Sequence, residues 1–233
     1  FGDIADLLAQ QHARMSAMEQ DVMFWLAVAR EPATPEELAA DIMARPTEAA
    51  VLVALHALRH RFLVERTETG FTLQNVVLEY FTAVLIEQAC KEITTGSMDL
   101  LQRIALVKAS AKSYVQESQR SLILGPIAGR LVRQLGPHQL MKQFNTILAQ
   151  LRHTQRRHED YAGGNILNLM VQAGLDLRGQ DFSQLPLRYA DLRNVVAQGV
   201  NFRQSDMSEC AFTDTFASVS SVVFSPDGQR VAA

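Results

Sequence analysis

Apolar side chains recur at every fifth position between residues 175 and 214. Eight consecutive units keep this register without an insertion, and their central residues are Leu177, Phe182, Leu187, Leu192, Ala197, Phe202, Met207 and Phe212. A period of five fits neither an α-helix, whose faces recur every 3.6 residues, nor a β-strand, whose faces recur every second residue. The period instead predicts a coil of square cross-section, in which each unit forms one side and directs its central residue inward. Stacked turns of such a coil pair as parallel strands roughly 4.8 Å apart.

Two of these units, Ala190–Asn194 and Val200–Gln204, resemble pentapeptide repeats. The resemblance implies about four units per turn, and so about two turns in this stretch. Solenoids need about three or more repeats with caps to stand alone, so we expect the coil to fold against its neighbours. We expect Pro186, which has no amide hydrogen, and the small Ala197 to mark its weakest sides. The expected coil core is formed by the larger central residues Leu177, Phe182, Leu187, Leu192, Phe202, Met207 and Phe212.

Towards the amino terminus, the pattern changes to helical spacing with two capping boxes, Ser16–Glu19 and Thr34–Glu37. They predict one helix from Ser16 to about Arg30 and a short one from Pro35 to Met43, with proline at the first helical position. A third helix is expected after Pro46, and it places Val51, Leu55 and Leu58 on one face.

Two short strands, residues 62–66 and 71–73, are expected next. Gly70 in the connection is expected to take the positive φ angle of a tight turn. Three helices and a hairpin predict a winged helix-turn-helix over residues 16–75, preceded by a connector over residues 1–15.

DNA binding is the first function to weigh for that fold. Base recognition requires Arg, Lys, Asn or Gln near the start of the exposed helix face. The third helix instead starts with Glu48 and is apolar almost all round, and its basic residues 59–61 lie at the far end. The hairpin adds Glu65 and Glu68. The pattern therefore disfavours nucleic acid as a partner and favours burial of the helix against protein.

Residues 76–174 predict a helical array without an evident repeat. A long amphipathic helix is expected from Asn75 to Thr95, ended by Gly96, and Ser97 is expected to cap the next helix. The remaining expected helices are 110–119, 121–135 with a break or kink at Gly125-Pro126, one that starts at Gly136-Pro137, and 164–173.

Residues 215–233 change character again. Residues 220–232 read as strand, Pro226-Asp227-Gly228 turn and strand. They resemble the inner hairpin of a WD-repeat propeller blade. Taken together, the elements predict a mainly α fold with a small β content: winged helix, helical array, pentapeptide-repeat coil and the start of a propeller.

This order of domains resembles the middle of bacterial STAND signalling NTPases, which combine an NB-ARC nucleotide domain with a WD-repeat sensor. The resemblance is carried by Met18–Ala27, Phe71–Gln74 and Tyr161–Leu169. It implies that residues 1–15 follow an upstream nucleotide-binding domain, that a propeller follows downstream, and that the resting state holds ADP. It also implies that a signal at the propeller leads to exchange for ATP and to homo-oligomerisation, which activates an effector.

Two features depart from that family. The phosphate loop G-x-x-x-x-G-K-[ST] is missing from the sequence, so ADP or ATP is expected to bind mainly to a domain outside this chain. The Met-His-Asp motif of the family aligns with Leu73, Gln74 and Asn75, which makes Gln74 and Asn75 the candidate nucleotide contacts. The alternative is that Gln74 is an ordinary polar residue at a strand end and Asn75 a helix cap.

Composition changes this picture little. The chain has 233 residues, a net charge of −3 and 20% charged residues, which argues against general attraction to nucleic acid or an anionic membrane. The cysteines Cys90 and Cys210 are expected to be buried thiols, which fits the cytoplasm. We expect neither a transmembrane helix nor a signal peptide. The chain starts with Phe1 and stops within an expected strand, which suggests a segment of a longer protein.

We found no constellation typical of catalysis or metal binding. His56 and His60 have the spacing of two ligands on one helix face, but no carboxylate or cysteine accompanies them and Arg59 and Arg61 would repel a cation. The basic run 152–158 is read as a solvated helix end, with a nucleic-acid patch or a docking surface for an acidic partner as alternatives. We therefore expect no metal and no enzyme activity in this chain, but a regulatory relay; the alternatives are a DNA-binding regulator and a passive scaffold.

Overall fold

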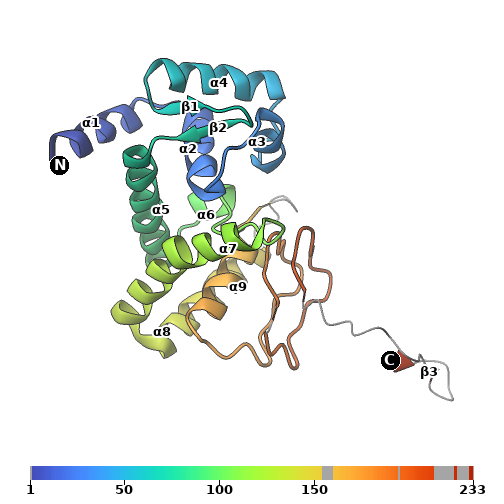
Figure 1. Ribbon diagram of the computed structural model, residues 1–233. Coiled ribbons are helices and arrows are strands. Elements are labelled where there is room, and N and C mark those ends of the chain that lie inside the picture. The colour runs from blue at the N-terminus through green and yellow to red at the C-terminus, as the bar shows by residue number, and fades with distance from the viewer. Residues whose placement is uncertain (1, 154–159, 194, 213–222, 225–230, 233) are drawn as a thin grey trace.

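The computed structural model describes residues 2–153, 160–193, 195–212, 223–224 and 231–232, and Figure 1 shows their arrangement. The basic residues Arg156, Arg157 and His158 and the Pro226-Asp227-Gly228 turn lie outside the described residues. The helices are α1 (Gly2–Ala13), α2 (Ala17–Ala29), α3 (Pro35–Asp41), α4 (Glu48–His60), α5 (Asn75–Thr95), α6 (Leu100–Arg103), α7 (Ser113–Gln119), η1 (Arg120–Leu124), α8 (Gly125–His153) and α9 (Ala162–Gln172). The strands are β1 (Val64–Arg66), β2 (Phe71–Leu73), β3 (Val223–Phe224) and β4 (Val231–Ala232), which form the antiparallel pairs β1–β2 and β3–β4. The protein is therefore mainly helical.

Helices α2 to α4 and the β1–β2 hairpin form one end of the molecule (Figure 1). Both expected capping boxes are present, because the side chains of Ser16 and Thr34 accept hydrogen bonds from the backbone of Glu19 and Glu37 and the two glutamates bond back. Helix α4 buries Val51, Ala54, Leu55 and Leu58 on the predicted face.

Gly70 differs from the expectation. Its φ angle is not positive, although a Cβ here would lie 2.5 Å from the carbonyl oxygen of Ala33. Ala33 forms an isolated bridge with Phe71, with both N···O distances at 2.9 Å. Glycine is needed at this position because another backbone approaches it closely, and not because of the turn.

Helix α5 has the predicted bounds, and Gly96 ends it with a φ angle of 77°. The prediction that Ser97 caps the next helix is wrong. The carboxylate of Glu92, on α5, accepts hydrogen bonds from the amides of Leu100 (2.8 Å) and Leu101 (3.0 Å), at the start of the short helix α6. A cap supplied from another helix cannot be detected in the residues adjacent to the helix start.

The predicted break at Gly125-Pro126 is also absent. The chain passes from α7 through the π-helical turn η1 into α8, and the amide of Gly125 bonds to the carbonyl oxygen of Arg120. Proline at the second position of α8 costs little because η1 already departs from α-helical hydrogen bonding. The predicted end of one helix and start of the next at Gly136-Pro137 is confirmed, because Gly136 has non-helical backbone angles within α8, with φ at 74°.

Residues 175–193 and 195–212 form a coil in which backbones twenty residues apart pair in parallel. The bridges join Asp181 to Asn201, Pro186 to Asp206, and Asp191 to Ala211. Pro186 does not weaken its side, because the amide of Leu187 donates to Asp206 (2.7 Å) and that of Asp206 to Leu185 (3.1 Å). The spacing is the one expected from four units of five residues.

Corners of the coil have a regular backbone. The second residue after a central position has a φ angle between 58° and 70°, as seen at Gly179, Gln184, Tyr189, Gly199, Gln204 and Glu209. Asp or Asn before the centre accepts a hydrogen bond from the amide two residues later, for example from Ser183 to Asp181 (3.0 Å). These side-chain bonds help the chain to turn without a glycine at every corner.

The two turns of the coil differ in burial. Leu177, Phe182, Leu187 and Leu192 are buried, whereas Phe202 and Met207 are partly exposed. Phe212, which we expected in the core, is 51% exposed. The first turn packs against α9, while the second is covered mainly by the first, with the rings of Phe182 and Phe202 stacked at 5.9 Å.

One continuous hydrophobic core runs from α1 to the coil, from Leu8 to Leu192. Its largest fully buried side chains include Trp25, Phe81 and Phe182. Among the described helices, none is long and apolar enough to cross a membrane.

Candidate functional site: the joint between the helical body and the coil

Helix α9 lies between α8 and the coil (Figure 1), and its residues 162–170 are all buried. Two glycines inside a helix cost roughly 1 kcal/mol each relative to alanine, so a compensating contact is expected. A Cβ on Gly163 would lie 2.3 Å from the carbonyl oxygen of Pro186, and one on Gly164 would lie 2.2 Å from that of Arg188. The backbones of α9 and the coil are thus in direct contact.

Two buried asparagines on α9 bind backbone groups of two different segments, α6 with the connection that follows it and the coil. Asn165 donates to the carbonyl oxygens of Leu101 and Ile104, both at 2.8 Å, and accepts from the amide of Leu106 at 2.8 Å. Asn168 accepts from the amide of Asp191 (2.8 Å) and donates to Tyr189 (3.0 Å). Among the described residues, the backbone groups that the two asparagines bind have no hydrogen bond within a helix or strand. The amide side chains of Asn165 and Asn168 supply the missing bonds.

Asp41, at the end of α3, connects the module formed by α2 to α4 and the β1–β2 hairpin to the joint between α9 and the coil. Its carboxylate accepts hydrogen bonds from Tyr189 in the coil (2.8 Å) and from Lys108 (2.6 Å), and its backbone carbonyl accepts from the Tyr161 hydroxyl (2.5 Å). Burial and the neighbouring Asp41 carboxylate raise the pKa of Tyr189, so its hydroxyl remains a donor. Three segments that are distant in the sequence therefore meet at one buried aspartate.

Aromatic rings surround this contact. Tyr161 stacks on Tyr189 with the ring centroids 5.8 Å apart and packs edge-on against Trp25 at 5.2 Å. The Arg188 guanidinium lies over Tyr161 at 5.1 Å. Rigid rings and cation–π contacts stabilise one relative position of α2, α9 and the coil.

A second polar cluster is centred on Asp191, two residues after Tyr189 in the same turn of the coil. Arg193 donates to its carboxylate from Nε (2.8 Å) and Nη2 (2.7 Å), and Arg120 of η1 donates to Oδ2. Arg193 also donates to Gln116 of α7. Burial would raise the pKa of Asp191, but hydrogen bonds from Arg193 and Arg120 outweigh it and hold the pKa below its usual value.

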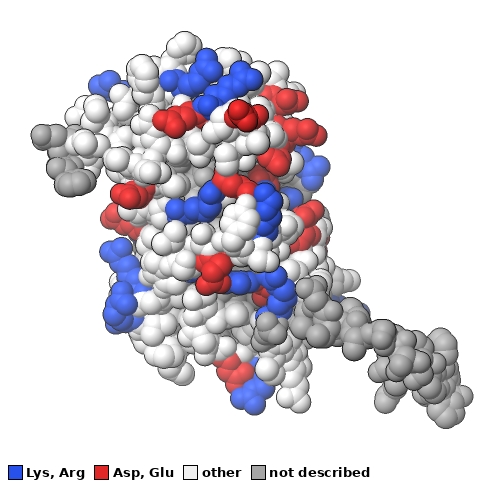
Figure 2. Space-filling model, in the orientation of Figure 1, with Lys and Arg blue, Asp and Glu red and all other residues white. Residues whose placement is uncertain are grey.

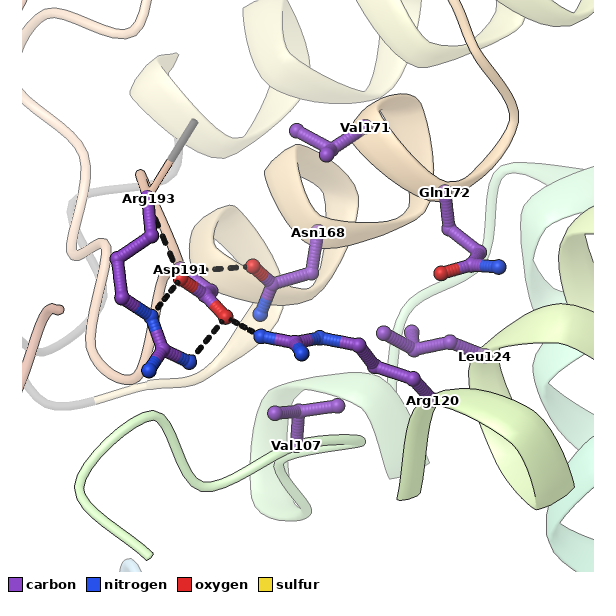
Figure 3. Close-up of a pocket in the computed structure, with 8 residues that line it drawn as sticks. All are labelled: Val107, Arg120, Leu124, Asn168, Val171, Gln172, Asp191 and Arg193. Carbon is purple, nitrogen blue, oxygen red and sulfur yellow. Dashed lines mark hydrogen bonds and ion pairs between the residues drawn. The ribbon is translucent and has the colours of Figure 1, made fainter. Parts of the chain in front are cut away.

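A cavity of about 440 Å³ opens beside this cluster (Figure 3). It is lined by Val107, Arg120, Leu124, Asn168, Val171, Gln172, Asp191 and Arg193. The lining comes from the connection after α6, which contributes Val107, and from η1, α9 and the coil, so the cavity lies where all four segments meet.

The predicted nucleotide contacts lie elsewhere. Gln74 is the N-cap residue of α5 and makes no side-chain capping bond, and Asn75 is the first helical residue; both are exposed. The alternative that Asn75 is the helix cap is therefore wrong by one residue, because Gln74 occupies the cap position. Neither lines the cavity at Asp191.

Helix α4 would be the helix that enters DNA in a winged helix-turn-helix. Its outward residues include Leu52, 37% exposed, and Val53, 71% exposed, together with His56 and His60. Figure 2 shows Lys and Arg interspersed with Asp and Glu over the face it displays, with one group of Lys and Arg at the end that carries α4. Among the described residues, no group of three or more His, Cys, Asp or Glu could hold a metal ion.

Sequence reasoning missed the residues that form the joint. Asp41, Tyr189 and Arg120 carried no motif of their own, and Asn165 and Asn168 lie in a stretch that carries the family resemblance but had no role assigned. A signal was present in the stretch 161–170, because two glycines and two asparagines interrupt an otherwise apolar helix. Buried polar residues and helix glycines both require a partner, which pointed to a close contact without identifying it.

Comparison with known proteins gives one relevant similarity. The chain is 39% identical over 266 aligned residues to a WD repeat-containing protein of Nostoc sp. (strain PCC 7120), and the alignment covers 100% of the chain but 21% of that relative. The chain thus spans about a fifth of the relative's length. No family model and no solved structure matched. The similarity supports a WD-repeat context, as the expected propeller hairpin does.

Proposed function

We propose that the chain is a non-catalytic regulatory relay of a STAND NTPase, which couples a WD-repeat sensor to an upstream NB-ARC nucleotide-binding domain. The WD repeat-containing relative supports the sensor part of this proposal. The buried joint supports the coupling part, because a rigid connection transmits a rotation that a flexible linker would absorb.

The observation that carries the proposal is the hydrogen bond from Tyr189 to Asp41 at 2.8 Å. It connects the coil directly to the end of α3. Because Gly163 and Gly164 have no side chains, the backbone of the coil also lies directly against α9. A displacement of the coil therefore displaces the α2–α4 module or breaks this contact.

In this proposal, α2 to α4 and the β1–β2 hairpin act as the winged helix that clamps the ADP-bound resting state. The order of the elements and the antiparallel register of Val64 with Leu73 are compatible with a wing. The coil acts as a pentapeptide-repeat spacer, for which the twenty-residue pairing is the support. ADP or ATP binds mainly to the upstream domain, and activation leads to homo-oligomerisation in the cytoplasm.

This chain contributes little to the nucleotide site itself. Gln74 and Asn75 lie exposed at the start of a 21-residue helix, where amide donors and the helix dipole favour an anion. They fit a peripheral contact to a phosphate held by another domain. In this proposal, ATP hydrolysis by the longer protein requires residues outside this chain.

The test compares self-assembly of the full-length parent with ADP and with a non-hydrolysable ATP analogue, measured by analytical ultracentrifugation. The wild type is expected to assemble only with the ATP analogue. Tyr189→Phe, which removes the bond to Asp41, is expected to change the fraction assembled at a given nucleotide concentration.

Tyr114→Phe is the matched control, because its hydroxyl binds the exposed carboxylate of Glu31 at 2.8 Å and lies outside the joint. It is expected to assemble like the wild type. Identical assembly of the wild type with both nucleotides would reject the switch and favour a passive scaffold.

A further inference from the structure

We infer that the cavity beside Asp191 is a binding site for a small organic anion that carries a carboxylate or phosphate group. This inference does not depend on the proposed role in a nucleotide switch.

The charge of the cavity supports an anion. Two arginines, Arg120 and Arg193, converge on one carboxylate, that of Asp191 (Figure 3). The lining therefore carries one positive charge more than it carries negative charge. The carboxylate of Glu117, 3.9 Å from Arg120, offsets part of this excess, and an anion in the cavity would add to that compensation.

Donors with spare capacity line the same space. Within the described part of the chain, Arg120 contacts only Asp191 and, at 3.9 Å, Glu117, although a guanidinium has five N–H donors. Gln172 forms no side-chain hydrogen bond with any described residue, and its side chain lines the cavity. Arg193 is already bound to Asp191 and Gln116, so it contributes charge and positions the carboxylate.

The backbone leaves room for a ligand at this place. Arg120 begins the π-helical turn η1, and π-helical turns within longer helices occur frequently at functional sites. Gly125 follows this turn, and a Cβ there would lie 3.8 Å from Nε2 of Gln172.

Apolar groups complete the lining. In Figure 3, Val171 lies above and Val107 below the Asp191 cluster, and Leu124 lies next to Arg120. A volume of about 440 Å³ falls in the range of ordinary small-molecule sites. The site thus favours an anionic head that binds Arg120 and Gln172, attached to a small apolar body.

The test is isothermal titration calorimetry of the 233-residue chain with three anions and a neutral analogue. The probes are inorganic phosphate, phenyl phosphate and benzoate, with phenol as the neutral analogue. We expect saturable binding of at least phenyl phosphate or benzoate and much weaker binding of phenol. Preference between phosphate and carboxylate probes identifies the head group.

Two variants locate the site. Arg120→Gln is expected to weaken binding by about tenfold or more, because a charge-assisted hydrogen bond is lost. Since this variant also leaves Asp191 with fewer partners, Gln172→Glu provides a second test that leaves the ion pairs in place. It adds a negative charge to the cavity and is expected to weaken binding by a similar factor.

Gln198→Glu is the matched control, since Gln198 is exposed on the coil and does not line the cavity. It is expected to bind the probes like the wild type. The inference is overturned if no anion saturates, if phenol binds as well as the anions, or if Gln172→Glu binds as tightly as Gln198→Glu.

Discussion

The hydroxyl of Tyr189 donates a hydrogen bond of 2.8 Å to the carboxylate of Asp41, across 148 residues of sequence. This contact joins the last residue of α3 to the first turn of the coil. It lies in a buried environment, where an unsatisfied polar group is costly, so its removal has a measurable effect on stability.

Tyr189→Phe is expected to lower the free energy of unfolding by about 1–3 kcal/mol, because Asp41 loses a buried donor while the ring still packs on Tyr161. Urea denaturation measures this change. Tyr114→Phe, at a 62% exposed residue, is the control and is expected to change stability by less than about 0.5 kcal/mol. Equal effects of both substitutions would contradict a special role for the buried contact.

Gly164→Ala is expected to destabilise the protein by about 3 kcal/mol or more, because the new Cβ would meet the carbonyl oxygen of Arg188 at 2.2 Å and backbone on both sides resists displacement. Gly129→Ala in α8 is the matched control, since the nearest atom is Nη1 of Arg133 at 3.4 Å. Alanine is expected to stabilise that helix by about 0.5–1 kcal/mol. Chemical denaturation distinguishes the two, and a Gly164→Ala protein as stable as wild type would refute the close contact.

Asp160 predicts a dependence of stability on pH. Burial raises its pKa from 3.8 to about 6, although the amide of Ala162 donates to it at 3.1 Å and opposes the shift. The folded state therefore binds a proton more tightly than the unfolded state. The protonated carboxyl of Asp160 therefore contributes about 2–3 kcal/mol to the free energy of unfolding. This contribution is present below pH about 4 and is lost as the pH rises through about 6.

Asp160→Asn is expected to remove this part of the pH profile, as measured by urea denaturation between pH 4 and 7. Asp176→Asn is a control of opposite sign, because hydrogen bonds from Arg178 lower the pKa of Asp176 to about 2. The contribution of Asp176 to the free energy of unfolding is constant above pH about 4 and is lost as the pH falls through about 2, so Asp176→Asn is expected to leave the shape of the profile between pH 4 and 7 unchanged. Parallel profiles of wild type and Asp160→Asn would show that Asp160 does not titrate in this range.

Glu92→Gln tests the cap that α5 supplies to α6. The substitution replaces one of the two oxygens that accept from Leu100 and Leu101, so a loss of about 1–2 kcal/mol is expected in thermal or urea unfolding. Glu87→Gln, at an exposed position of α5, is expected to change little. If both variants unfold alike, the Glu92 carboxylate does not stabilise α6.

DNA binding, the alternative for the α2–α4 module, can be tested by fluorescence anisotropy with duplex DNA at several salt concentrations. Because α4 exposes Leu52 and Val53, and not a row of basic groups, we expect weak binding with a shallow salt dependence. A steep decrease of affinity with salt would indicate several phosphate contacts and would favour a DNA-binding regulator.

Much of the secondary structure followed from the sequence because its signals are local. The capping boxes at Ser16 and Thr34 act over three residues, and Gly96 ends α5 through its own backbone conformation. The five-residue period likewise specified the coil, since each side repeats the same local turn. The predictions for Ser97 and Gly70 were wrong because a residue from another part of the chain decides the local structure. Glu92 caps α6 in place of Ser97, and the backbone of Ala33 requires glycine at position 70.

The sequence by itself therefore determined which segments are helical and which form the coil, because helix caps and repeat periods depend on neighbours within a few residues. Only the tertiary structure decided that Asp41, Tyr161 and Tyr189 meet, that Asn168 binds the coil, and that Arg120 and Arg193 share Asp191. Such pairs form when separate elements pack against a common core. Neither the spacing nor the type of these residues carries that information.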